Sequence, residues 1–147
     1  MEVLVIDAGI DSMDPYTEEI GEFWVKVQLK SGKKLTITEI GKFDPRPYSN
    51  QKIEVLIGAG GVEVIDTTLN PDMDISYHSV IKGKFKEHYK IPSKWRDYGN
   101  EVRSAIETPD GIYIVGKLDT KKLKLKNGFE IVVDTRRYDI LDWYPLE

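Results

Sequence analysis

Short runs in which apolar and polar residues alternate recur along the whole chain, and turn-forming residues separate them. A period of two is typical of β-strands that bury one face. Ten such runs can be recognised and no long helix, so the sequence predicts an all-β fold. Successive hairpins favour an antiparallel barrel, with a two-sheet sandwich as the alternative. Two short helical turns are expected, at 15–20 and 92–99.

The apolar pattern also predicts register. For the hairpin of 23–29 and 35–40, an odd-numbered loop pairs Leu29 with Leu35 and puts apolar residues opposite one another. A register shifted by one residue would set apolar residues opposite polar ones. The expected buried face is Phe23, Val25, Val27 and Leu29. The same reasoning at Asn127-Gly128 predicts a three-residue loop with Gly128 left-handed, which pairs Leu125 with Phe129.

Two further hairpins follow from turn-forming residues. Thr108-Pro109-Asp110-Gly111 suits a turn that sets Thr108 opposite Ile112 and Ile106 opposite Ile114. The glycine run 58–61 matches no phosphate-binding motif and is interpreted as the turn between strands 53–57 and 62–66. The terminal run 139–144 is expected to close the sheet and to bury Leu141 and Trp143.

Length and composition limit the functional classes. A chain of 147 residues fits a single domain, 1–147. It contains no cysteine, which excludes disulfides, thiolate-bound zinc and a cysteine nucleophile. No apolar run approaches the roughly 20 residues of a membrane span, and no basic segment precedes the short apolar run at the N-terminus. We therefore expect a soluble, cytoplasmic protein.

Charge is distributed unevenly. The net charge is −4, but residues 1–74 contain 14 acidic and 7 basic side chains, whereas residues 75–147 contain 11 and 14. Such asymmetry steers charged partners if folding preserves it as two faces.

The first candidate site is the basic and aromatic stretch 82–96. Lysines that alternate along a strand share one face, and cationic grooves with stacking aromatics hold single-stranded nucleic acid. Three interpretations stay open: a solvated edge strand protected by lysines, a site for nucleic acid or another anionic ligand, and a surface for an acidic protein. The candidate residues are Lys82, Lys84, Lys86, Lys90, Trp95 and Arg96.

Metal and catalytic signatures are weak. The acidic cluster Asp7, Asp11 and Asp14, continued by Glu18, Glu19 and Glu22, lacks the spacing of a calcium loop, and Asp72-Met73-Asp74 is no better. His78 and His88 form no metal or triad motif. We predict no metal and no cofactor.

The sequence thus favours a non-enzymatic binding or interaction domain with a protein partner, acting through 82–96 and the loop 45–47. One alternative is binding of single-stranded nucleic acid or another polyanion. Another is a barrel enzyme that places the carboxylates of Asp66 or Glu107, or His78, in a cavity. No catalytic residue is assigned.

Overall fold

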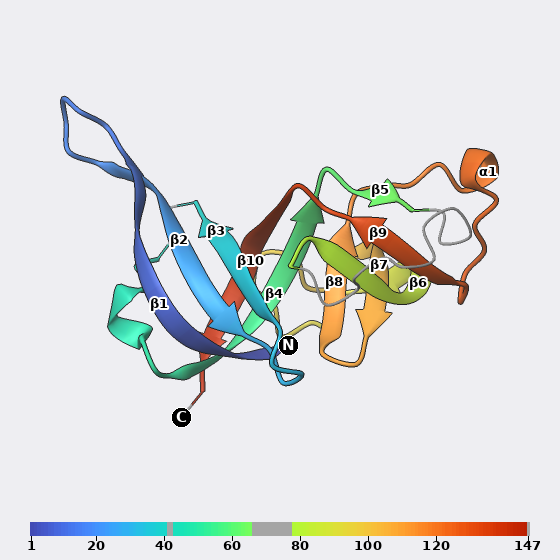
Figure 1. Ribbon diagram of the computed structural model, residues 1–147, viewed down its shortest axis with the longest axis horizontal. Coiled ribbons are helices and arrows are strands. Elements are labelled where there is room, and N and C mark those ends of the chain that lie inside the picture. Colours follow the sequence, from blue (N-terminus) through green and yellow to red (C-terminus); the bar gives the residue numbers. More distant parts are fainter. Residues whose placement is uncertain (41–42, 66–77, 147) are drawn as a thin grey trace.

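The computed structural model describes residues 1–40, 43–65 and 78–146. These form ten strands and two short helices (Figure 1). In chain order they are β1 (Glu2–Met13), β2 (Ile20–Gln28), β3 (Lys34–Glu39), the 3-10 helix η1 (Arg46–Tyr48), β4 (Lys52–Gly60), β5 (Glu63–Val64), β6 (Val80–Lys90), β7 (Val102–Thr108), β8 (Gly111–Val115), α1 (Thr120–Leu123), β9 (Glu130–Asp134) and β10 (Arg137–Pro145). The all-β prediction is confirmed.

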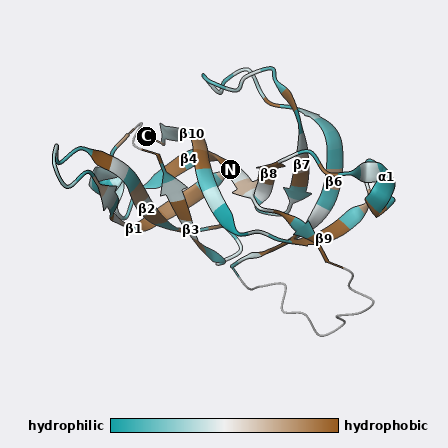
Figure 2. Ribbon diagram, turned by 90° about the horizontal axis from the view of Figure 1, so that it is seen from above, coloured by the Kyte–Doolittle hydropathy of each residue, from teal (hydrophilic) through white to brown (hydrophobic). Residues whose placement is uncertain are grey.

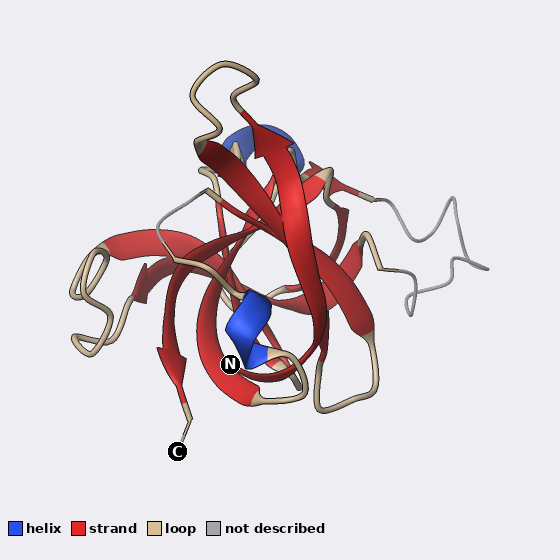
Figure 3. Ribbon diagram, turned by 90° about the vertical axis from the view of Figure 1, so that its left-hand side faces the viewer, coloured by secondary structure: helices blue, strands red, loops and turns tan. Residues whose placement is uncertain are grey.

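Five strands close into a barrel, in the order β1-β2-β3-β10-β4, because β4 also pairs with β1. The barrel occupies one half of the molecule, and its strands curve around a common interior in Figure 3. The terminal strand β10 lies between β3 and β4, so the C-terminal segment completes the barrel as predicted. The barrel preferred from sequence is confirmed, although β3 and β10 are parallel neighbours.

The other half consists of β8, β7, β6, β9 and β5, in that order. Strand β4 connects it to the barrel, because Ile57 to Ala59 pair in parallel with Tyr113 to Val115 of β8. Hydrophobic and hydrophilic residues alternate along several strands (Figure 2). The main apolar cluster includes residues of both halves, such as Val3 of the barrel strand β1 and Val133 of β9 in the other half. No helix in the described residues is long and apolar enough to cross a bilayer.

Two short helices occur, as the sequence predicts, but at η1 and α1 and not at the predicted positions 15–20 and 92–99. Residues 15–17 form the turn of a long β1–β2 hairpin, and residues 93–99 form successive turns. At the first site, the Asp14 carboxylate accepts hydrogen bonds from the backbone N–H groups of Tyr16 and Thr17, as a helix cap would. The chain then reverses at Glu18, whose positive φ of 60° is incompatible with continuing a helix.

The β2–β3 hairpin shows the predicted buried face in a different register. Phe23, Val25, Val27 and Leu29 are all buried. Val27 pairs with Leu35 rather than with Ile37, a shift of two residues that keeps every side chain on its face. The loop is a three-residue one, closed by the backbone bond from Leu29 N–H to Lys33 O.

The hairpin predicted at Asn127-Gly128 does not form. Gly128 is left-handed, with φ of 88°, but the preceding residues form α1 and β9 pairs with β6 and β5. Glu130 therefore lies opposite Lys84 of β6. Asp119 caps α1 by accepting the Lys122 N–H, which draws this segment away from a strand.

Two other hairpin predictions fail for a common reason. Thr108 pairs with Gly111 and Ile106 with Tyr113, one residue away from the predicted register. The glycine run is the end of strand β4, and the chain turns at Gly61, with φ of 63°. Strands β4, β7 and β8 bury residues on both faces, so alternation does not identify their register.

Candidate functional site

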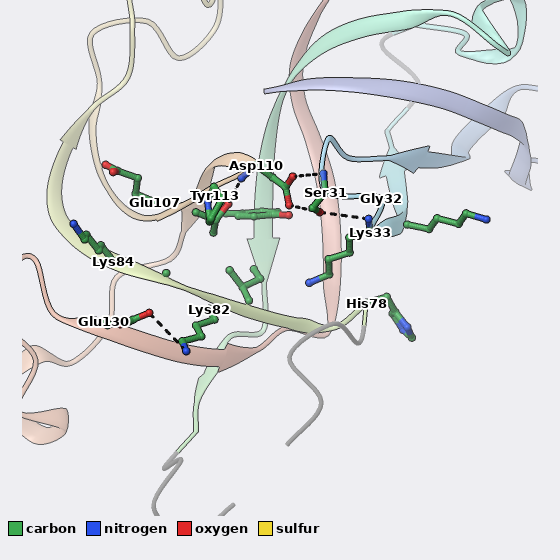
Figure 4. Close-up of a pocket in the computed structure, with 15 residues that line it drawn as sticks. Ser31, Gly32, Lys33, His78, Lys82, Lys84, Glu107, Asp110, Tyr113 and Glu130 are labelled. Atoms are coloured by element: carbon green, nitrogen blue, oxygen red, sulfur yellow. Dashed lines mark hydrogen bonds and ion pairs between the residues drawn. The ribbon is translucent and has the colours of Figure 1, made fainter. Parts of the chain in front are cut away.

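A groove of about 1110 Å³ lies between the barrel and the other half of the molecule (Figure 4). Its walls come from the β2–β3 turn, the first part of β6 and the β7–β8 turn. The lining residues are Ser31, Gly32, Lys33, Lys34, His78, Ile81, Lys82, Gly83, Lys84, Glu107, Thr108, Pro109, Asp110, Tyr113 and Glu130. A groove of this size accommodates a small organic ligand.

The inner surface of the groove is apolar. Ile81 and Tyr113 belong to the main core cluster, and Gly83 also lines the groove. Burial raises the pKa of the Tyr113 hydroxyl far above its ordinary value. The phenol is therefore neutral well beyond the physiological pH range, and its ring forms part of the buried core beneath the groove.

The rims of the groove are joined by hydrogen bonds between segments far apart in sequence. Asp110 accepts bonds from the backbone N–H and the hydroxyl of Ser31, at 2.8 and 2.7 Å. Lys33 Nζ donates to the backbone oxygen of Val80 at the start of β6. These contacts hold the β2–β3 turn against the other half of the molecule.

Three lysines form a row on the exposed side of β6. Lys82 lies 3.8 Å from Glu130, and Lys86 lies 3.8 Å from Glu107. Lys84 lies between these pairs and makes no ion pair within the described part of the chain. Lys84 thus has no carboxylate within ion-pair distance among the described residues, although Glu107 and Glu130 lie opposite it on the neighbouring strands.

A smaller pocket of about 440 Å³ adjoins the groove and shares Lys34 and His78 with it. Arg137 in this pocket is bound by Asp139, with Nε 2.9 Å from Oδ1. The Tyr138 hydroxyl donates to the His78 backbone oxygen at 2.5 Å. The lining residues are Lys26, Lys34, Leu35, Thr36, His78, Ser79, Thr135, Arg136, Arg137 and Tyr138, with no carboxylate among them.

The electrostatic character of this surface opposes that of the whole chain. Seven lysines and arginines line the two cavities, together with three carboxylates, in a protein of net charge −4. A concave surface with excess positive charge attracts anions.

The structure places the six sequence-predicted site residues apart. Lys82 and Lys84 line the groove, and Lys86 follows them on β6. Lys90 lies at the end of that strand. Trp95 is buried, only 3% exposed, and stacks on Tyr144 at 5.0 Å between ring centroids. Arg96 lines a separate small cavity beside Asp142.

The edge-strand interpretation of the lysine row is wrong, because β6 pairs with β7 on one side and with β9 on the other. Sequence reasoning also missed five cations of the cavities, Lys26, Lys33, Lys34, Arg136 and Arg137. The adjacent pairs Lys33-Lys34 and Arg136-Arg137 were the available signal. Their convergence depends on strands that are distant in sequence.

The acidic cluster of the N-terminal region lies on the projecting β1–β2 hairpin (Figure 1). Hydrogen bonds from the backbone N–H groups of Tyr16 and Thr17 lower the pKa of Asp14. No group of three metal-ligating side chains occurs within the described ranges. Asp66 and Asp72-Met73-Asp74 lie outside the described residues.

The remaining sequence candidates are dispersed. His78 lines both cavities, whereas His88 is exposed and lies 3.8 Å from Glu87. In the terminal strand, the predicted burial of Leu141 and Trp143 is wrong: both are half-buried, and the buried residues of β10 are Tyr138, Ile140 and Asp142. Residues 45–47 form the N-cap and the first part of η1, and none of them lines the groove.

No protein-family model matches the sequence, and no curated protein matches it. Among solved structures, the cytoplasmic molybdate-binding protein ModG, in a form with molybdate bound, has a TM-score of 0.49 and 14% sequence identity. The match covers 91% of this chain and 86% of that chain. At this level of similarity the comparison gives no information about the ligand of the present chain.

Proposed function

We propose that this chain is a binding domain for a small anionic ligand with an apolar body, held in the groove between β6 and the β2–β3 and β7–β8 turns. The observation that supports it is the combination of an apolar floor with cations on the rim. Removing the ligand's apolar body from water contributes affinity, at about 25 cal/mol per Å². Lys84 and Lys34 supply the charge.

The state of the groove carboxylates favours binding over catalysis. Asp110 is engaged by Ser31, and Glu130 and Glu107 lie beside Lys82 and Lys86. Each therefore has a structural partner that competes with a role as general acid or base. The barrel-enzyme alternative, with Glu107 or His78 in the groove, stays a prediction.

The aromatic content favours a small ligand over a nucleic-acid strand. Single-stranded nucleic acid binds along grooves in which several aromatic rings stack on successive bases. Among the described residues, Tyr113 is the one tyrosine, phenylalanine or tryptophan that lines the groove, and Trp95 is buried elsewhere. The polyanion and protein-partner alternatives make different predictions in the same experiment.

The experiment is a thermal-unfolding screen of the full chain with nucleotides, sugar phosphates, aromatic carboxylates and their neutral analogues. A ligand present at 100 times its Kd stabilises the folded state by about 2.7 kcal/mol. We expect at least one anionic class to raise Tm saturably and its neutral analogue to raise it less. Oligothymidylate is included, because binding that falls steeply with salt would favour the polyanion alternative.

Two variants locate the binding. Lys84→Gln removes a groove cation that makes no ion pair with the described residues, and is expected to weaken binding at least fivefold. Lys121→Gln makes the same charge change on α1, which lines neither cavity, and is expected to leave binding unchanged. A screen with no stabilising anion, or binding unaffected by Lys84→Gln, contradicts the proposal.

A further inference from the structure

The smaller pocket gathers three cations that have no partner among the described residues. Lys26 comes from β2, Lys34 from the start of β3 and Arg136 from the turn between β9 and β10. No ion pair or side-chain hydrogen bond involves any of the three within that part of the chain. Three separate segments therefore place positive charge around one cavity.

This arrangement carries an electrostatic cost in the unliganded protein. Like charges on neighbouring strands repel, and the cost is relieved when a counter-charge lies between them. Several cations elsewhere on the surface have a carboxylate beside them, such as Arg46 with Asp44, Lys94 with Glu54 and Arg103 with Glu101. The described residues that line the smaller pocket include no carboxylate to play this part.

We propose that the smaller pocket is a phosphate subsite, which binds the phosphate group of a phosphorylated small molecule whose apolar body lies in the groove. The placing of the apolar body in the groove rests on the proposed function, whereas phosphate binding by the smaller pocket does not. Lys34 and His78 line both cavities, so a single ligand can extend from one into the other.

The donor set suits phosphate. A phosphate monoester presents three terminal oxygens and a charge of about −1.5 to −2 at neutral pH. Arg136 can donate two parallel N–H bonds, and Lys26 and Lys34 act as point charges. The Thr36 side chain, directly opposite Lys26 in the β2–β3 ladder, and Ser79 add neutral hydroxyl donors. A carboxylate has fewer oxygens and a single charge, and would leave part of this set unused.

The direct test uses inorganic phosphate as the probe. The ¹⁵N-labelled full chain is titrated with phosphate, and with chloride at matched ionic strength, while amide chemical shifts are recorded. We expect saturable shifts for Thr36, Ser79 and Arg136 with phosphate and none with chloride. Linear shifts spread over the surface, or equal shifts with chloride, would overturn the phosphate subsite.

Variants separate the two cavities. Arg136 and Lys26 line the smaller pocket and not the groove. The substitutions Arg136→Gln and Lys26→Gln should each weaken phosphate binding at least tenfold. Lys84 lines only the groove, and Lys121 lines neither cavity. The Lys84→Gln and Lys121→Gln variants should therefore bind phosphate as the parent does. Phosphate binding that is insensitive to Arg136→Gln and Lys26→Gln refutes the assignment.

Matched compounds test the link between pocket and groove. AMP is compared with adenosine, and glucose 6-phosphate with glucose. For any pair that binds, the phosphorylated member should bind at least tenfold more tightly, and Arg136→Gln should abolish that advantage. If carboxylates bind the groove and phosphate confers no advantage, the proposed function stands and the phosphate subsite fails. If phosphate binds the smaller pocket but Lys84→Gln changes the affinity of no ligand, the phosphate subsite stands and the proposed function fails.

Discussion

The carboxylate of Asp110, in the β7–β8 turn, accepts two hydrogen bonds from Ser31, in the β2–β3 turn, 79 residues away in sequence. The backbone N–H and the hydroxyl of Ser31 both donate, at 2.8 and 2.7 Å. This contact joins the barrel to the other half of the molecule at the rim of the groove (Figure 4). It fixes the width of the groove at this point.

Removing Asp110 is therefore expected to affect both stability and binding. Asp110→Ala loses two hydrogen bonds worth about 0.5–1.5 kcal/mol each, and urea unfolding measures the change. Ser31→Ala loses the hydroxyl bond alone and should cost about half as much. Ligand affinity should fall in Asp110→Ala as the rim loosens. Equal stability of the two variants and the parent would show that the contact is not maintained in solution.

Gly83 is expected to tolerate no side chain. A Cβ at this position would lie 2.3 Å from the Glu107 backbone oxygen and 2.8 Å from the Ile106 side chain. Gly83→Ala must push β6 away from β7 and should lower the free energy of unfolding by about 1–3 kcal/mol, the usual cost of overpacking. Gly116→Ala is the control, since no atom lies within 4 Å of its Cβ position. Similar unfolding midpoints for both variants would contradict the close approach.

Burial of Tyr113 predicts loss of stability in alkali. Its pKa in the folded state is raised by burial above the ordinary 10.0, so the folded protein retains a proton that the unfolded chain releases. The contribution of the protonated Tyr113 to the free energy of unfolding is fully present below pH 10 and is lost progressively as the pH rises further. Tyr113→Phe should flatten this fall in urea unfolding measured from pH 8 to 12. Tyr16→Phe, at a side chain that is 94% exposed, should not change it.

Trp95 is expected to contribute to stability rather than to stack on a ligand. Its ring packs in the smaller apolar cluster with Ile91, Ala105 and Ile114, and against Tyr144. Trp95→Ala should cost roughly 3–5 kcal/mol in unfolding free energy. Below its lowered Tm, the variant should bind anions in the groove as the parent does. Lost binding with unchanged stability would instead support a stacking role.

The sequence by itself determined the fold class, most strand positions and the buried face of β2, because these depend on local alternation and turn residues. It also identified Lys82 and Lys84, which share one face of one strand. Tertiary structure decided the register wherever a strand is buried on both faces, as in β4 and β8, since alternation is then uninformative. It also decided the candidate site, because pairings between strands that are distant in sequence place Lys84 in the groove and Arg136 in the adjoining pocket, with Lys34 lining both. Such pairings depend on packing of the whole core, which no local pattern encodes.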